Sequence, residues 1–372
     1  MGLLAVVFLL AAWAGVTTPG RAAVKALLFI PEIIPSAPLH PQEWVTGTPT
    51  HQKVRFPVGG GEGDGDLYIP AGEGKHPAVV LFFGIIPAGP DDPRIVNLAD
   101  GLARSNMVVL IPWSPVMTAS YRLDPAAVGL LVDAFNYLKA RPDVDPARIG
   151  MAGFCVGASF ALMAAEDDGI RDEVAYVNDF GGYYNAQDLL VAIASHARFY
   201  GGASEPWQPR DDTRRVFATH LIESLDSQEE RNALAQVFLE GGTPAQLDTS
   251  RLSEQGNVVY KLLSGVSLEE AGALLKALPP AFLSELDAVS PSTRIAALKA
   301  PVLIMHDRED TAIPSPESHR LAGALAKRGH VYYTEFSLFQ HVDPTRPLPP
   351  PDMARELWKL LVHMYHVMLL GT

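Results

Sequence analysis

Short runs of consecutive apolar residues alternate with amphipathic segments along two stretches of this chain. Six runs are typical of strands buried on both faces of a sheet: 78–83, 107–111, 149–154, 175–180, 301–305 and 331–336. Helical spacing of apolar residues marks the segments 91–105, 125–140, 316–328 and 357–368. This alternation predicts an α/β fold, with a mostly parallel sheet, helices on both faces and right-handed crossovers. A hairpin of 53–57 and 66–70, joined by the glycine-rich turn 59–65, is expected before the first run.

The alternation stops near residue 184 and resumes at 288. The intervening residues 185–287 contain amphipathic helical stretches, and sequences typical of capping boxes begin at Ser227 and Ser267. We therefore expect a helical insertion that forms a lid or cap over the sheet edge, between two parts of the core at 53–184 and 288–372. A separate helical domain with its own partner is the alternative.

The first residues carry a different pattern. Residues 2–16 are almost wholly apolar, a run that is long for the core of a secretory signal and short for a membrane span. Arg21 and Lys25 follow the run and favour an uncleaved anchor, whereas residues 12–14 match a small-x-small cleavage pattern. We expect 1–35 to be a signal- or anchor-like segment outside the fold and 36–52 to be a linker. The protein would then be membrane-associated, or secreted after cleavage; a buried N-terminal helix is the alternative.

Composition narrows the range of functions. The chain has 372 residues and a formal net charge of −13, with no cluster of lysine and arginine, which argues against nucleic-acid binding. The single cysteine excludes an intramolecular disulfide and a multi-cysteine metal site. The glycine run at 59–65 lacks the Lys-Ser/Thr and the helix of a phosphate-binding loop. We therefore expect neither a metal nor an organic cofactor.

That single cysteine, Cys155, lies at the centre of Gly-Phe-Cys-Val-Gly, between a strand-like run and a helical run of small residues. A strand–turn–helix of this kind is the context of a nucleophile elbow, in which flanking glycines allow a sharp turn. The pattern therefore predicts a nucleophile at the sheet edge. A small buried apolar side chain is the alternative, because free cysteine often has that role.

A base and an acid are available where parallel strands end. His341 follows the strand predicted at 331–336, and three carboxylates, Asp307, Glu309 and Asp310, follow the strand at 301–305. Loops at the carboxyl ends of parallel strands meet at one edge of the sheet. A thiol attacks well as a thiolate, so a histidine oriented by a carboxylate would complete the site.

The elbow with its lead-in (144–157), the Asp-x-x-Ile-Pro at 310–314 and the late Gln-His at 340–341 resemble the dienelactone hydrolase family of the α/β-hydrolase superfamily. The likeness extends over roughly 50–185 and 288–370. It implies an α/β-hydrolase fold in which Cys155 is the nucleophile, Asp310 the acid and His341 the base. In this fold the oxyanion hole consists of backbone N–H groups, here expected from Val156 and Ile85.

A cysteine nucleophile also constrains the substrate. A thiolate leaves a tetrahedral intermediate more readily than an alkoxide or an amine anion does, so productive substrates need a good leaving group. We therefore expect hydrolysis of an activated ester or lactone, a small molecule, through an acyl-cysteine. Two alternatives remain at this point: a non-catalytic, membrane-tethered binding module with the same fold, and an acyltransferase that uses the same three residues.

Overall fold

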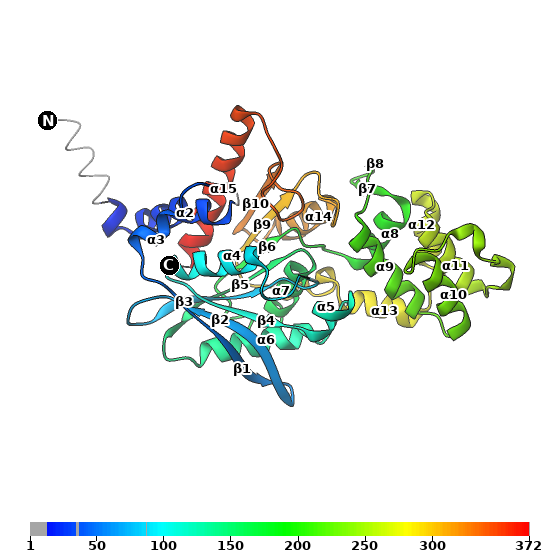
Figure 1. Ribbon diagram of the computed structural model, residues 1–372, viewed down its shortest axis with the longest axis horizontal. Coiled ribbons are helices and arrows are strands. Elements are labelled where there is room, and N and C mark those ends of the chain that lie inside the picture. The colour runs from blue at the N-terminus through cyan, green and yellow to red at the C-terminus, as the bar shows by residue number, and fades with distance from the viewer. Residues whose placement is uncertain (1–12, 35–36, 87, 372) are drawn as a thin grey trace.

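The central sheet has eight strands and sets the position of every other element. The computed structural model describes residues 13–34, 37–86 and 88–371 (Figure 1). In spatial order the strands are β1 (Thr50–Val58), β2 (Gly61–Ile69), β4 (Val108–Trp113), β3 (His76–Phe82), β5 (Val144–Phe154), β6 (Val177–Phe180), β9 (Val302–Asp307) and β10 (Val331–Phe336). The pairs β1–β2 and β2–β4 are antiparallel, and all the others are parallel. The predicted α/β fold with a mostly parallel sheet is confirmed.

Helices cover both faces of this sheet, each over its own apolar layer. On one face lie α6 (Ala127–Lys139), α7 (Val156–Ala165) and α14 (Pro316–Leu325). On the other lie α2 (Thr18–Ile33), α4 (Pro93–Arg104) and α15 (Pro350–Leu370). Strands β3, β4, β6 and β9 and residues 149–153 of β5 are almost entirely buried, because both faces of the sheet are covered there. The α/β part of the chain also contains two short helices, α3 (Pro41–Val45) and α5 (Pro115–Ser120).

The hairpin turn is tighter than the glycine run suggested. It consists of residues 59 and 60, and Val58 pairs with Gly61, so that residues 61–65 belong to strand β2. The glycines allow this strand to pass close to its neighbours: a Cβ on Gly65 would lie 2.9 Å from the carbonyl oxygen of Ile111. The glycine run is therefore part of the sheet rather than a long loop.

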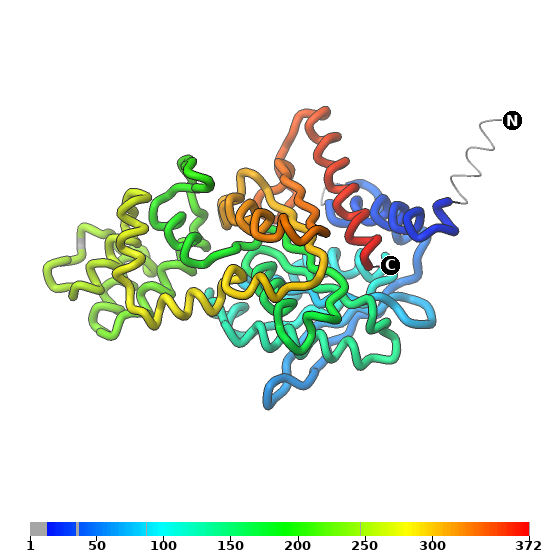
Figure 2. Tube along the Cα trace, turned by 180° about the vertical axis from the view of Figure 1, so that it is seen from behind, coloured from blue at the N-terminus to red at the C-terminus, as the bar shows by residue number. Residues whose placement is uncertain are grey.

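The segment 185–287 is helical and projects to one side of the sheet, away from α2 (Figures 1 and 2). Its elements are α8 (Ala186–Ser195), β7 (Ala197–Tyr200), β8 (Ala203–Pro206), α9 (Asp211–Glu223), α10 (Gln228–Phe238), α11 (Glu254–Ser264), α12 (Leu268–Leu275) and α13 (Pro280–Ala288). Two 3-10 turns, Pro244–Gln246 and Thr249–Arg251, lie between α10 and α11, and two more, Pro291–Thr293 and Ile295–Ala297, follow α13. The hydroxyls of Ser227 and Ser267 accept hydrogen bonds from the N–H groups of Glu230 and Glu270, as expected of helix N-caps. The helices share an apolar core of their own.

The expectation that residues 1–35 lie outside the fold does not hold for 18–33, which form helix α2. Its apolar residues Ala22, Ala26, Phe29 and Ile30 recur at helical spacing and are buried against the layer that includes α4 and α15. Burial of this stripe holds the helix on the domain. Residues 1–12, which hold most of the apolar run at 2–16, lie outside the described residues. Among the described residues, no helix is both long enough and apolar enough to cross a membrane.

Glu166, at the C-terminal end of α7, is buried without a compensating partner for one of its oxygens. It is 1% exposed, and its Oε1 has no hydrogen-bond partner. Burial raises the pKa of this carboxyl to about 8, although Arg294 and Arg328 act in the opposite direction. The folded protein thus binds a proton that the unfolded chain has released between about pH 4.5 and pH 8.

We therefore expect the free energy of unfolding to fall as pH rises through that range, because the proton must leave a buried group. The variant Glu166→Gln removes this titration and should be more stable than the parent at pH 8 by about 4 kcal/mol, with little difference at pH 4.5. Urea unfolding of the parent and the variant at both pH values measures this difference in free energy. An equal effect of the substitution at the two pH values would contradict the assignment.

Candidate active site

Cys155 lies in a strained turn between β5 and α7. Its φ of 55° and ψ of −135° are unusual for a residue with a side chain. The N–H of Cys155 donates to the carbonyl oxygen of Phe180, 2.9 Å away, which holds the turn against β6. The side chain is partly exposed and lines a cavity above the sheet. The elbow predicted from the sequence is thus present, and its thiol is accessible.

Three glycines allow backbone to meet backbone beside this turn. A Cβ on Gly157 would lie 2.3 Å from the carbonyl oxygen of Phe82, and one on Gly153 would lie 2.4 Å from that of Gly157. A Cβ on Gly84, whose φ is +70°, would lie 2.8 Å from the nitrogen of Gly157. The loop after β3 therefore packs directly on the first turn of α7. This approach brings the two expected oxyanion residues, Ile85 and Val156, to the wall of the same cavity.

His341 and Asp310 are hydrogen-bonded to each other. Nδ1 of His341 lies 2.7 Å from Oδ2 of Asp310, and the ring lines the same cavity as the Cys155 side chain. The other carboxylate oxygen, Oδ1, accepts the N–H groups of Ala312 and Ile313 at 2.7 and 3.1 Å. A carboxylate that accepts three hydrogen bonds has one fixed orientation, and it fixes the ring. The three residues predicted from three separate strand ends are thus brought together.

The surroundings of His341 favour the protonated form of its ring. Burial disfavours a charged ring, but the Asp310 carboxylate and the Cys155 sulfur raise the pKa of His341 well above its ordinary value. Burial likewise opposes ionisation of Asp310, yet its interactions with His341 and His306 and its backbone donors lower the pKa of that carboxyl. The arrangement is suited to hold a proton on His341 beside the Asp310 carboxylate.

The other two candidate acids have structural partners instead. Asp307 is buried, pairs with Arg346 at 2.9 Å and accepts the N–H of Phe339 at 2.9 Å. Glu309 is largely exposed and pairs with Arg198 on the surface. Of the three carboxylates within residues 307–310, only Asp310 therefore contacts His341 among the described residues.

Sequence reasoning missed His306, the first residue of the His-Asp pair at the end of β9. Its Nε2 donates to the carbonyl oxygen of Ile313 at 2.9 Å and lies 3.6 Å from the Asp310 carboxylate, and its Nδ1 accepts from the Ser318 hydroxyl. Burial lowers the pKa of this ring, which supports a neutral histidine bracing the acid loop. Its position four residues before Asp310 was the available signal.

The insertion is also attached to the acid loop. The indole N–H of Trp207 donates to the carbonyl oxygen of Asp310 at 2.7 Å, and the N–H of Arg210 donates to that of Thr311 at 2.9 Å. The hydroxyl of Thr213 donates to the carbonyl oxygen of Ala312 at 3.1 Å. The N-terminal turn of α9 is therefore part of the cavity wall. The sequence alone could not indicate this contact.

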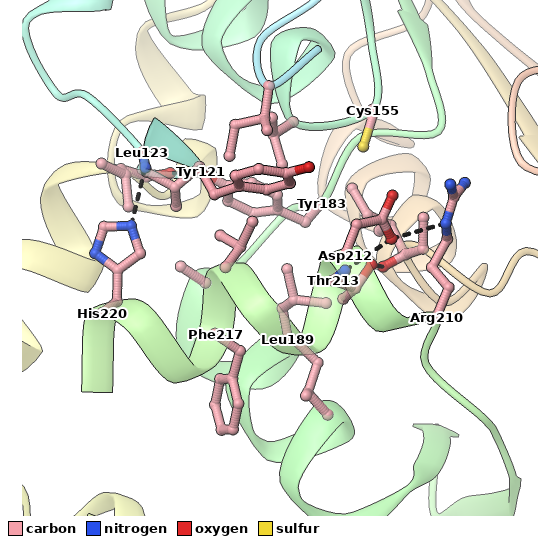
Figure 3. A pocket seen from close by; sticks show the side chains of 18 of the residues that line it. Tyr121, Leu123, Cys155, Tyr183, Leu189, Arg210, Asp212, Thr213, Phe217 and His220 are labelled. Carbon is pink, nitrogen blue, oxygen red and sulfur yellow. Dashed lines mark hydrogen bonds and ion pairs between the residues drawn. The ribbon is translucent and has the colours of Figure 1, made fainter. Parts of the chain in front are cut away.

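The site opens into a cavity of about 520 Å³ between the sheet edge and the insertion. Figure 3 shows Cys155 on the core side, with Arg210, Asp212 and Thr213 from the insertion facing it. The remaining wall is mostly apolar and includes Leu189, Phe217, Phe282 and Leu286. Within the described part of the chain, no cluster of three or more His, Cys, Asp or Glu side chains could hold a metal ion.

The close approach of Gly84 gives a test of the oxyanion geometry. Gly84→Ala would place a Cβ 2.5 Å from Val156 Cγ2, displace the loop, and is expected to lower kcat by about 10²-fold. Gly89→Ala is the matched control in the same loop, because Gly89 also has a positive φ, +76°, but no atom of the described residues, its chain neighbours aside, lies within 4 Å of its Cβ position. It should cost about 1 kcal/mol of stability and leave kcat unchanged. Equal kinetic effects would contradict the role of the contact.

The chain's sequence has a family match over the elbow. The model of the dienelactone hydrolase family matches residues 117–220, which include Cys155 and the first part of the insertion. The resemblance to the dienelactone hydrolase family is confirmed. This match begins later than the expected likeness and, unlike it, continues into the insertion. It supports an enzyme that hydrolyses ester bonds. No curated protein sequence matches the chain.

The comparison with solved structures finds chains that are partly similar to this one. An esterase from Pyrobaculum calidifontis is 16% identical, with 96% of each chain covered and a TM-score of 0.49. A carboxylesterase from a metagenomic library is 16% identical, with 88% of this chain and 91% of that chain covered and a TM-score of 0.48. The acylaminoacyl peptidase of Pyrococcus horikoshii is 16% identical, with 84% of this chain covered and a TM-score of 0.48. The chain spans about two fifths of the length of the acylaminoacyl peptidases that it matches.

Proposed function

We propose that this protein hydrolyses an activated ester or lactone through an acyl-cysteine, with Cys155 as nucleophile, His341 as base and Asp310 as the acid that orients it. One observation carries the proposal: the Asp310 carboxylate hydrogen-bonds His341, and His341 and Cys155 together line a cavity large enough for a small ester.

The reaction has two halves. The thiolate of Cys155 attacks the ester carbonyl carbon, and a C–S bond forms as the carbonyl oxygen becomes an oxyanion. The oxyanion collapses, the C–O bond to the leaving group breaks, and imidazolium His341 gives its proton to that oxygen. Water then attacks the thioester while His341 takes its proton. The C–S bond breaks, and the acid product and the thiolate–imidazolium pair are restored.

We expect backbone N–H groups to stabilise the developing oxyanion. Val156 is the first residue of α7, so its N–H has no partner within the helix and lies at the positive end of the helix dipole. Ile85, in the loop that Gly84 packs against α7, is the proposed second donor. Because both donors are backbone groups, substitutions act on them through geometry.

Adduct formation on residue 155 tests the proposal. The protein is mixed with p-nitrophenyl acetate, quenched within seconds and digested, and the mass of the peptide that contains Cys155 is measured. A burst of p-nitrophenol and an acetyl group on this peptide alone are expected. Turnover without an adduct on this peptide in the parent, together with equal turnover by Cys155→Ala, would reject the cysteine mechanism. Transfer of the acyl group to an added alcohol rather than to water would instead indicate an acyltransferase.

Association with a membrane is the second part of the proposal. It is supported by the apolar run at 2–16, whose last residue, Val16, is exposed, and by the exposed side chain of Leu27 on α2. The full-length protein should float with phosphatidylcholine vesicles in a density gradient. Recovery of the full-length protein only in the vesicle-free fractions would reject this part and leave the catalytic proposal unchanged.

A further inference from the structure

A second cavity, of about 380 Å³, lies on the sheet face that α2, α4 and α15 cover. Strands β3, β5, β6 and β9 form its floor, and the three helices form its roof. Its wall is apolar over most of its area and includes Leu81, Leu98, Leu102, Met107, Met364 and Val367. The mechanism proposed above uses none of these residues.

The two cavities share part of their walls. Six residues line both of them: Phe83, Ile86, Arg94, Phe154, Val342 and Asp343. Phe154 immediately precedes Cys155, and Val342 immediately follows His341. The shared wall, called the junction below, therefore includes the chain neighbours of the proposed nucleophile and base.

Aromatic rings continue from the junction into the second cavity. The rings of Phe83 and Phe154 stack with centroids 5.2 Å apart, Phe154 and Phe180 are 5.3 Å apart, and Phe180 and Phe339 are 4.8 Å apart. All four line the second cavity. A row of this kind offers continuous apolar contact to a chain that lies along it.

The two charged residues at the junction, Arg94 and Asp343, neutralise each other. Arg94 donates to both oxygens of Asp343 at 3.0 and 2.8 Å and to Asp92 at 2.6 Å. One guanidinium with two carboxylates has a net charge of −1, so this group of three does not attract an anionic substrate. The junction is thus suited to a neutral, apolar group.

We propose that the two cavities form one site and that the second takes a long, unbranched aliphatic acyl chain of the substrate. The leaving group would then occupy the cavity beneath the insertion. This inference rests on the proposed function and deepens it, because it names the substrate class as esters of aliphatic acids. Each methylene that enters an apolar site gains about fourfold in affinity by transfer from water, so selectivity should increase with chain length until the cavity is full.

A plug in the second cavity tests this. Leu98 is in α4, lines only the second cavity, and lies outside the proposed catalytic group. Leu98→Trp should keep kcat/KM for p-nitrophenyl acetate and butyrate within about twofold of the parent and lower it at least tenfold for the decanoate and dodecanoate esters. Val96→Trp is the matched control: the same substitution on the same helix, at a residue that lines neither cavity, should retain the parental chain-length profile.

Two further measurements separate this inference from the proposed function. Val367→Phe narrows the same cavity from α15, so it should shorten the preferred chain even if Leu98→Trp proves unstable. Binding of 1-decanol to Cys155→Ala, measured by calorimetry, needs no turnover and should weaken at least tenfold when Leu98→Trp is added. Hydrolysis of short esters with no gain from longer chains, and no effect of either plug, would overturn the acyl-chain site and leave the enzyme standing. Decanol binding that the plug weakens, with no ester hydrolysed, would support the cavity and reject the enzyme.

Discussion

Cys155→Ala is expected to lower kcat/KM for an activated ester by about 10⁴-fold or more, because no other described side chain that lines the cavity is a comparable nucleophile. Cys155→Ser should retain part of the activity, since its hydroxyl occupies the same place at the elbow but is not ionised by His341. Ester hydrolysis by both variants, with unfolding midpoints to verify the fold, measures this. Parental activity in Cys155→Ala would remove the catalytic proposal and favour a binding module with this fold.

A second substitution of Cys155 should abolish activity and yet increase the stability of the fold. Cys155 has a φ of 55°, which costs a residue with a Cβ about 1–3 kcal/mol and glycine nothing. Cys155→Gly should therefore be inactive and yet more stable than the parent by about 1 kcal/mol, after the greater freedom of glycine in the unfolded chain is subtracted. Cys155→Ala, which keeps the Cβ, is the control. A loss of stability in Cys155→Gly would show that the turn is not strained.

Asp310→Asn is expected to lower kcat by about 10³- to 10⁴-fold with little change in KM. The N–H groups of Ala312 and Ile313 both point at Oδ1, so the amide oxygen of the substituted side chain would take that position and its NH₂ group would face His341. An N–H donor there favours the wrong tautomer of the ring and no longer stabilises an imidazolium. The pKa of His341, followed by NMR, should fall together with kcat.

The neighbouring carboxylates supply the controls for this substitution. Glu309→Gln removes a largely exposed charge and should leave both kcat and stability nearly unchanged. Asp307→Asn weakens a buried pair with Arg346, so it should lower the unfolding midpoint while the remaining folded protein keeps its kcat. A larger kinetic effect at Asp307 than at Asp310 would contradict the assignment of the acid.

The parts of the site that could be predicted are those written in short stretches of sequence. The elbow needs a strand, two glycines and a helix within a few residues of Cys155, and each has a local pattern. His341 could be placed because it follows a recognisable strand. The residues alone left three candidate acids, and the resemblance to a family, rather than spacing, selected Asp310. Trp207 and His306 went unnoticed because their partners depend on how distant loops meet.

The amino-acid sequence by itself determined the alternation of strands and helices, the helical insertion and the glycine-flanked turn around Cys155, since apolar periodicity and backbone freedom act over neighbouring residues. Only the tertiary structure decided which carboxylate touches His341, that α2 belongs to the fold, and that Gly84 packs on Gly157. It also decided that two cavities share a wall beside Cys155. These outcomes depend on strand order and helix packing, which bring together residues that are far apart along the chain and leave no mark in any local pattern.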